Sequence, residues 1–267
     1  DTLGRKTALD DPDLGRWTYG YDAAGNLATQ TDARGITTRY RYDALDRKVE
    51  EDYPNDPSVF WFYDQDLIGT LSRVIDHAGE VDYGYDERLR KVRETRRLDG
   101  YEWTTEWAYD ALDRKVRQVY PNGEVAEYVY NNQGLLDAIP GVVPNLDYNA
   151  AGLMTEKAYA NGIITSYDYD ARNQRLVRIF APGVQDLNYS YDAVGNVLAI
   201  GDSIAGDTEQ FGYDELDRLI TAGDSGYSFT YSYDAVGNML EVNEDGFLVE
   251  YGHGDGAGPH AVTSMTV

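Results

Sequence analysis

Aspartate is the residue that most invites a catalytic interpretation of this sequence. Two carboxylates can cleave a glycosidic bond, one as the acid and the other as base or nucleophile, and the chain carries 47 Asp and Glu residues. However, Asp22, Asp43 and Asp192 each follow a tyrosine, and the same Tyr-Asp pair recurs along the whole chain. A catalytic pair is singular, whereas a residue repeated at a regular period is typical of structure. We therefore interpret these aspartates as turn-forming residues and expect no enzyme.

The sequence gives little indication of a metal or cofactor site. The chain has no Cys, which excludes disulfides and thiolate metal sites. Its three histidines, His77, His253 and His260, are scattered without the spacing of zinc ligands. Residues 243–250 faintly resemble a calcium loop, but the ligand spacing is wrong for one. We expect no cofactor, and calcium binding elsewhere on the acidic surface stays open.

The Tyr-Asp pair defines eleven repeats of about 21 residues. The repeated tyrosines are Tyr21, Tyr42, Tyr63, Tyr85, Tyr109, Tyr130, Tyr148, Tyr169, Tyr191, Tyr213 and Tyr233. Two residues earlier stands another aromatic residue in every repeat except the one with Leu146. A spacing of two places both side chains on one face of a strand. The pattern therefore predicts a strand ending at each tyrosine, with ladders of aromatic rings between successive repeats.

A turn is predicted directly after each Tyr-Asp pair. The fourth residue after the tyrosine is Gly, Asn or Asp in nine repeats, and these types tolerate a positive φ. This favours a type I turn followed by a left-handed residue. Leu67 and Leu89 break the rule, so we expect those two turns to differ in shape.

Each repeat then reads as strand, turn, strand, turn, because a return strand leads to a second turn such as Asn122-Gly123. The fold class is all-β, an antiparallel meander of about 22 strands curled into a spiral or open shell wall. Residues 1–267 are expected to be a single array and a fragment of a longer shell. Two prolines within residues 138–144 predict an interrupted ladder. The basic residues between Arg88 and Arg97 are expected to pair with neighbouring acids across strands.

The net charge of the chain limits the kinds of molecule that it can bind. The formal net charge is −24, which disfavours nucleic acid and anionic membrane. No apolar run is long enough for a membrane-spanning helix, so we expect no membrane insertion. Open sheet edges allow self-association.

The repeats resemble those of the RHS/YD-repeat family. The motifs that carry the resemblance are YDALDR at 42–47 and 109–114, YDELDR at 213–218, and YDAVGN at 191–196 and 233–238. The resemblance covers nearly the whole chain and implies a spiral β-shell like the cocoons of bacterial toxin complexes and the teneurin shell. It further implies a toxin or other C-terminal cargo of the parent chain as partner. The family's self-cleaving aspartate motif is absent, so autoproteolysis is not expected.

The functional hypothesis is a structural scaffold that forms part of a hollow shell around such cargo, in a secreted or cell-surface bacterial protein. The alternative is an extracellular adhesion or recognition module that binds glycan or protein through exposed aromatic residues. The residues expected to build the repeat are Tyr21, Asp22, Gly25, Tyr42, Asp43, Tyr109, Asp110, Tyr169, Asp170, Tyr191, Asp192, Gly195, Tyr213, Asp214, Tyr233, Asp234 and Gly237.

Overall fold

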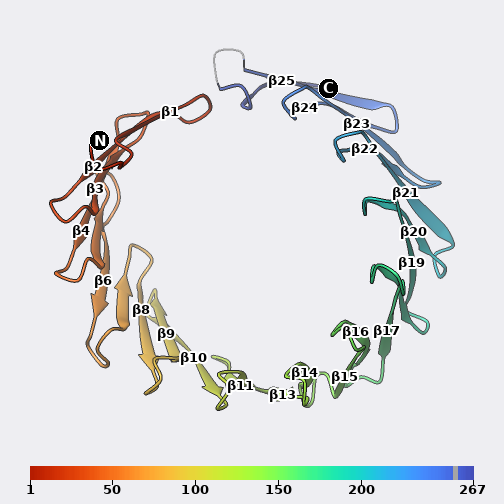
Figure 1. Cartoon of the computed structure of the whole chain (residues 1–267), viewed down its shortest axis with the longest axis horizontal. Coiled ribbons are helices and arrows are strands. Elements are labelled where there is room, and N and C mark those ends of the chain that lie inside the picture. The colour runs from red at the N-terminus through yellow and green to blue at the C-terminus, as the bar shows by residue number, and fades with distance from the viewer. Residues whose placement is uncertain (255–257) are drawn as a thin grey trace. The chain divides into compact units, whose positions relative to one another are not determined.

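The computed structural model describes residues 1–254 and 258–267, and this part of the chain contains strands and turns but no α-helix. The strands form three sheets, and within each sheet every strand pairs antiparallel with its sequence neighbours. Figure 1 shows the strands following one another in chain order. The predicted all-β meander is confirmed. Within residues 1–254 and 258–267 it has 26 strands in place of about 22. The eleven repeats supply two strands each, and the others are β1 before the first repeat, β25 and β26 after the last, and β12, the detached first half of one repeat strand.

The chain divides into two compact units, Asp1–Glu127 and Tyr128–Val267. The first unit is one sheet of twelve strands in sequence order. Its strands are β1 (Ala8–Asp11), β2 (Gly15–Tyr21), β3 (Leu27–Thr31), β4 (Thr37–Tyr42), β5 (Lys48–Asp52), β6 (Val59–Tyr63), β7 (Leu71–Ile75), β8 (Glu80–Tyr85), β9 (Lys91–Leu98), β10 (Tyr101–Tyr109), β11 (Lys115–Val119) and β12 (Val125–Glu127).

The second unit holds a two-stranded sheet followed by a twelve-stranded one. The pair is β13 (Val129–Tyr130) and β14 (Leu136–Ala138). The longer sheet contains β15 (Asn145–Tyr148), β16 (Met154–Ala158), β17 (Ile164–Tyr169), β18 (Leu176–Ala181), β19 (Gln185–Tyr191), β20 (Val197–Asp202), β21 (Asp207–Tyr213), β22 (Leu219–Gly223), β23 (Ser228–Tyr233), β24 (Met239–Glu244), β25 (Phe247–His253) and β26 (Val262–Thr266).

A β-bulge lies at every repeated tyrosine. In the second repeat Arg41 pairs with Glu50 but Tyr42 pairs with Lys48, so Val49 is the extra residue. The same shift precedes each of the other ten tyrosines. A bulge bends its strand and increases the local right-handed twist. One bulge per hairpin therefore gives each long sheet a regular source of curvature, and both sheets bend along their strand order in Figure 1.

Each sheet is a single layer rather than half of a sandwich. Among the described residues, the buried hydrophobic side chains are Val143, Leu146 and Ala181 alone. Most strand residues are half-buried, so stability comes from neighbour-to-neighbour contacts along the strand order, as in other repeat proteins.

The two prolines interrupt the ladder as predicted. After β14 the chain makes an isolated bridge between Ile139 and Val143, with Gly141 at a φ of 83° between them. β14 and β15 share no ladder, and they belong to separate sheets of the second unit.

No helix that would be long and apolar enough to cross a membrane occurs within residues 1–254 or 258–267.

Candidate functional site

The carboxylate of each repeat closes the turn that follows its strand. In the second repeat the Asp43 amide donates to the Arg47 carbonyl at 2.9 Å, and the Asp46 amide donates to the Asp43 carbonyl at 3.1 Å. Asp43 Oδ1 then accepts the amides of Leu45 and Arg47 at 2.9 and 3.0 Å. Its Oδ2 accepts Arg47 Nε at 2.7 Å. Both carboxylate oxygens are thus occupied within the turn.

The same arrangement recurs in the other repeats that carry Asp. The carboxylates of Asp22, Asp86, Asp110, Asp170, Asp192, Asp214 and Asp234 each accept amides of their own turn. Asn131 and Asn149 do so with their side-chain carbonyls. The predicted repeat residues are therefore spread along two sheets and are not gathered into one site.

The turn lowers the pKa of its aspartate. The Arg47 guanidinium, followed by backbone amides, lowers the pKa of Asp43 below 3.8. A backbone hydrogen bond from Asn26 lowers the pKa of Asp22 in the same way. A general acid needs a raised pKa, so these carboxylates are ionised acceptors and poor proton donors.

Left-handed residues follow the aspartates at nearly every predicted position. A positive φ occurs at Gly25, Asp46, Leu89, Asp113, Gly134, Gly152, Gly195, Asp217 and Gly237. The expectation of a different turn at Leu89 is wrong. Leu89 has a φ of 62°, and its turn keeps the hydrogen bond from the Asp86 amide to the Arg90 carbonyl. Arg90, which binds Asp86 Oδ2 at 2.7 Å, holds the loop in the common shape.

Two other turns depart from the pattern. The turn with Leu67 differs as expected, because it is longer and closes from the Asp64 amide to the Thr70 carbonyl. The turn after Tyr169 is one residue longer than predicted, since the Asp170 amide donates to the Arg175 carbonyl. Its left-handed residue is Gln174, with a φ of 60°, and not Asn173.

A residue that sequence reasoning missed links several of the turns to the next one. This is the Arg or Asn that ends the turn. Arg47 donates to the Asp64 carboxylate of the following repeat at 3.0 and 2.6 Å. Asn196 donates to Asp192 of its own turn at 2.9 Å and to Asp217 of the next at 2.8 Å. The signal was present in the sequence as the alternation of YDxxDR with YDxxGN.

The linking residue has equivalents in other repeats, but not in those whose turns end at Thr70, Leu135 or Leu153. Arg90, Arg175 and Arg218 reach backbone carbonyls of the next turn, and Asn26 reaches the Asp46 carboxylate. A further turn of this kind occupies residues 1–5, where Asp1 binds Arg5 and Gly4 has a φ of 75°. These contacts give polar links between several neighbouring Tyr-Asp turns within each unit.

The tyrosine hydroxyls form a second set of links. Tyr191 donates to the Leu176 carbonyl at 2.7 Å, and Leu176 opens the return strand of the preceding repeat. Equivalent bonds are made by Tyr21, Tyr42, Tyr109, Tyr148, Tyr169, Tyr213 and Tyr233. Burial raises the pKa of Tyr42 and of Tyr169, so both phenols stay protonated and able to donate.

The expected ladder of stacked rings is replaced by alternating rings and cations. Equivalent rings of successive repeats are two strands apart, about 10 Å, which is too far for ring contact. Cations from the intervening strand or turn fill the space. Lys48 Nζ lies 4.0 Å from the Trp61 ring centroid and 5.7 Å from that of Tyr40, and Arg47 lies 4.4 Å from the Tyr63 centroid. Within the described ranges the ring-on-ring contacts are Tyr101–Trp103, Tyr227–Phe229 and Phe229–Tyr231.

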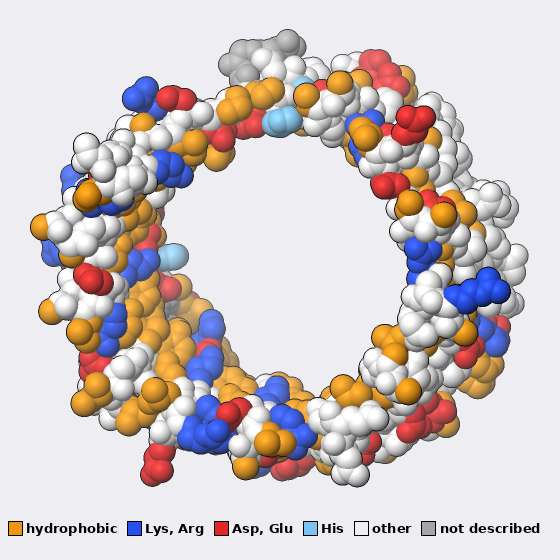
Figure 2. Space-filling model, in the orientation of Figure 1, with side chains coloured by type: hydrophobic (Ala, Val, Ile, Leu, Met, Phe, Trp, Pro, Cys, Tyr) orange, Lys and Arg blue, Asp and Glu red, His pale blue; other side chains and the backbone are white. Residues whose placement is uncertain are grey.

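The basic cluster of β8–β11 is paired with acids, as expected. Arg97 binds Glu80, Asp82 and Glu102, and Lys91 binds Glu94 at 2.7 Å. Figure 2 shows blue and red side chains interleaved over this arc. The cluster is therefore an ion-pair network, with pairs both across strands, as at Arg97, and within β9, as at Lys91.

The histidines and the calcium-like stretch 243–250 lie in strands and turns of the described part of the chain. No group of three His, Asp or Glu residues with metal-binding geometry occurs in the described part of the chain. His260 Nδ1 lies 2.7 Å from Asn238 Oδ1, and His253 lies at the position of a repeated tyrosine, with the same bulge before it. In the stretch 243–250, Asn243 Oδ1 accepts the Gly246 amide, and Asp245 Oδ1 accepts the Ser228 amide.

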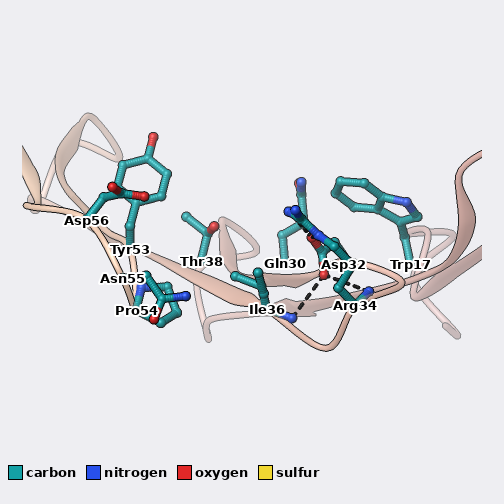
Figure 3. A pocket seen from close by; sticks show the side chains of 10 residues that line it. All are labelled: Trp17, Gln30, Asp32, Arg34, Ile36, Thr38, Tyr53, Pro54, Asn55 and Asp56. Carbon is teal, nitrogen blue, oxygen red and sulfur yellow. Dashed lines mark hydrogen bonds and ion pairs between the residues drawn. The ribbon is translucent and has the colours of Figure 1, made fainter.

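A groove of about 330 Å³ lies on the first unit, away from the Tyr-Asp turns. Figure 3 shows the rings of Trp17 and Tyr53 toward its two ends, with Gln30 and Thr38 between them. Asp32 on its floor is bound to Arg34 at 2.7 Å. The Tyr53 hydroxyl donates to Glu51 at 2.6 Å, which raises the pKa of Tyr53 to about 12. The groove thus offers two aromatic rings and neutral polar groups, together with the charged side chains of Asp32, Arg34 and Asp56.

Two family models match the chain. The RHS Repeat model matches residues 1–37 and 21–57, and the Teneurin YD-shell model matches residues 144–252. The chain therefore carries RHS and YD repeats over residues 1–57 and 144–252.

Relatives of this RHS/YD array include two toxin subunits of Yersinia entomophaga. Toxin subunit YenC1 is 33% identical over 117 residues, which are 37% of this chain and 12% of YenC1. Toxin subunit YenC2 is 42% identical over 69 residues, 22% of this chain and 7% of YenC2. The chain thus spans only a small part of these relatives.

Solved structures share the fold over nearly the whole RHS/YD array. A crystal structure of TcdB2-TccC3 superposes with a TM-score of 0.83 at 20% identity, covering 94% of this chain and 17% of that chain. The Photorhabdus luminescens Tc holotoxin pore gives 0.81 at 20% identity, covering 94% of this chain and 16% of that one.

Proposed function

We propose that residues 1–267 act as one repeat array that forms part of the wall of a hollow β-shell enclosing a toxin or other cargo. The observation that carries the proposal is the likeness of 94% of the chain to TcdB2-TccC3, at a TM-score of 0.83. The identity of part of the chain to two toxin subunits supports it. The single-layered sheets support it as well, because a wall has two accessible faces.

The repeated Tyr-Asp residues have a structural role in this proposal and no catalytic one. Their carboxylates are saturated by turn amides and their hydroxyls by carbonyls of the preceding repeat. The partner is cargo carried by the parent protein, and the location is secreted, as befits a toxin subunit. Neither nucleic acid nor a membrane is a partner of the proposed wall.

Protease protection tests this function. In the full-length protein that contains the chain, the cargo segment is expected to resist a protease that cleaves it at once when it is expressed alone. A wall-weakening double variant, Asp192→Ala with Tyr191→Ala, is expected to speed cleavage, whereas Glu215→Gln on an exposed turn is not. Equal cleavage of enclosed and free cargo contradicts the proposal.

A recognition module for glycan or protein is the second candidate, and the groove of Trp17 and Tyr53 is the observation that favours it. Aromatic rings with nearby amides and hydroxyls suit a flat polar ligand. A glycan array probed with the chain and with Trp17→Ala separates the candidates. Binding that is lost in the variant favours recognition, and no binding by either protein removes this candidate.

A further inference from the structure

Exposed aromatic side chains gather at one corner of the first unit. Tyr101 and Trp103 of β10 are 69% and 40% exposed, and Tyr120, which follows β11, is 40% exposed. The rings of Tyr101 and Trp103 stack with their centroids 5.9 Å apart. Beside them lies a groove of about 420 Å³, which we call the corner groove. It is lined by Trp103, Tyr120, Pro121, Asn122 and Glu124.

Strand β10 extends beyond its neighbour β11 at this corner. Residues 101–106 pair with β9, but the ladder to β11 begins only where Glu106 pairs with Val119. Continuing that register places Pro121 opposite Thr104, and a proline has no amide to donate to a ladder. Among the described residues, the stretch of β10 before Glu106 therefore pairs on the β9 side alone.

Alternate residues of this stretch direct their peptide groups to the open side. The β9–β10 hairpin closes at the pair Leu98 and Tyr101, across a two-residue turn. From such a closing pair, hydrogen-bonded pairs alternate with pairs whose amides and carbonyls point outward. Glu102 and Thr104 belong to the second kind, and the hydroxyls of Thr104 and Thr95 lie 3.0 Å apart across that close pair. Their peptide groups are thus placed to bond an added strand.

The other Tyr-Pro turn of this unit has no such opening. Pro54 follows Tyr53 after β5, just as Pro121 follows Tyr120 after β11. However, the facing strand β4 begins at Thr37 and has six residues, whereas β10 has nine. The open edge therefore depends on the longer β9–β10 hairpin.

Elsewhere in this sheet a cation fills the space between two aromatic rings. Lys48 lies between the rings of Trp61 and Tyr40, and its Nζ binds the Glu51 carboxylate at 2.7 Å. The same set forms around Lys91, which has two rings and a glutamate as neighbours. Two rings, one cation and one carboxylate thus make a recurrent unit of the sheet.

The corner groove presents the rings and the carboxylate of this unit, through Trp103, Tyr120 and Glu124. The cross-strand neighbour of Trp103 is Arg96, but its guanidinium is bound to Glu94 at 2.7 Å. Over residues 1–254 and 258–267, no Lys or Arg lies over the Trp103 ring, and the Glu124 carboxylate has no ion pair. The described chain therefore supplies no cation to Trp103 or Glu124.

We propose that the corner groove binds an extended segment of a partner polypeptide that carries Lys or Arg. The segment pairs with the open edge of β10, and its cationic side chain packs on Trp103 and pairs with Glu124. Charge favours this occupant, because the chain has a net charge of −24 and a cation gains most over a Trp ring. The groove lies within the first unit, so the inference is independent of the enclosure of cargo.

Fluorescence anisotropy tests the side-chain contact. The probe is a short labelled peptide of alternating Thr and Val with one central Arg, and its matched control carries citrulline at that position. The Arg peptide is expected to bind about tenfold more tightly than the citrulline peptide. Trp103→Ala and Glu124→Gln are each expected to weaken its binding about tenfold. Phe247→Ala and Glu87→Gln, at exposed positions elsewhere, are the matched controls and leave it unchanged.

Backbone methylation tests the strand pairing. Only alternate amides of an added strand face β10. Arg peptides with N-methyl groups on one alternate set of amides are therefore expected to bind about tenfold more weakly than those methylated on the other set. Equal affinities of the two methylated peptides overturn the pairing.

Three further results overturn the proposal. The first is an Arg peptide that does not bind, or binds no better than the citrulline peptide. The second is binding that Trp103→Ala leaves unchanged while circular dichroism shows the variant to be folded. The third is sedimentation in which the chain alone self-associates and Trp103→Ala abolishes the association, which assigns the groove to a second copy. A neutral glycan whose binding is lost in Trp103→Ala assigns it to a saccharide instead.

Discussion

The guanidinium of Arg47 donates two hydrogen bonds, of 3.0 and 2.6 Å, to the carboxylate of Asp64 in the next repeat. The same guanidinium binds Asp43 of its own turn at 2.7 Å. One side chain therefore closes a turn and fastens it to the next. Because no sandwich core covers these sheets, such links between neighbouring repeats are central to the stability of the wall.

Replacing the linking arginine is expected to weaken both turns. Arg47→Ala removes bonds to Asp43 and Asp64 and leaves two neighbouring carboxylates without their shared cation. We expect a lower midpoint of urea unfolding. Arg41→Ala is the matched control, since the Arg41 side chain is 72% exposed and makes a single ion pair with Glu50. A smaller loss for Arg47→Ala than for Arg41→Ala counts against the linking role.

A branched side chain at a left-handed glycine is expected to be costly. Gly195 has a φ of 120°, and an added Cβ would lie 3.0 Å from a guanidinium nitrogen of Arg175. Gly195→Val is expected to lower the free energy of unfolding by more than about 1 kcal/mol. Ala193→Val, two residues earlier in the same turn and not at a positive φ, serves as control. Equal melting temperatures for Gly195→Val and the native protein refute the turn assignment.

Leu89 offers the opposite test, because a leucine occupies the left-handed position there, with a φ of 62°. Leu89→Gly is expected to raise the free energy of unfolding by about 0.5–1 kcal/mol, since the left-handed conformation costs an L-residue about 1–2 kcal/mol and glycine loses more backbone entropy. Leu112→Gly, at an exposed turn position without a positive φ, should destabilise. Parallel changes in both variants rule out the backbone explanation.

The tyrosine hydroxyls can be tested without disturbing the rings. Tyr191→Phe removes the bond to the Leu176 carbonyl and is expected to lower the free energy of unfolding by about 1 kcal/mol. Tyr101→Phe is the control, because Tyr101 is 69% exposed and is not one of the repeated tyrosines. Chemical denaturation of the two variants side by side measures the difference, which vanishes if the hydroxyl bond contributes nothing.

The turn aspartates predict a pH dependence of known sign. The folded-state pKa of Asp43 lies below 3.8, so its contribution to stability is fully present above that value and is lost as pH falls through the folded pKa. The stability difference between the native protein and Asp43→Asn should therefore be constant near neutrality and shrink in acid. Urea titrations at several pH values measure it, and a difference that grows in acid gives the wrong sign.

The sequence predicted the strands and most turns because both depend on local residue types. Tyr and Trp at a spacing of two mark strands, and Gly or Asp at the fourth position marks the left-handed residue. The prediction of a different turn at Leu89 is wrong because the bond between Arg90 and Asp86 holds the turn in its usual shape. It does so although leucine disfavours a positive φ.

The bulges and the links between repeats are harder to derive from local patterns. The extra residue at Val49 depends on register between two strands, which the composition of either strand does not reveal. The bond from Arg47 to Asp64 depends on which repeats become neighbours in space. The prediction of stacked aromatic rings was wrong in detail because a return strand lies between the rings of successive repeats. This strand places Lys48 between Tyr40 and Trp61.

The proposed function requires that the chain be a segment of an enclosing wall. Cryo-electron microscopy of the full-length protein tests this directly. We predict a hollow shell in which residues 1–267 form curved rows of wall, with density for cargo confined inside. A map in which these residues stand outside any cavity, with cargo free in solvent, contradicts the account.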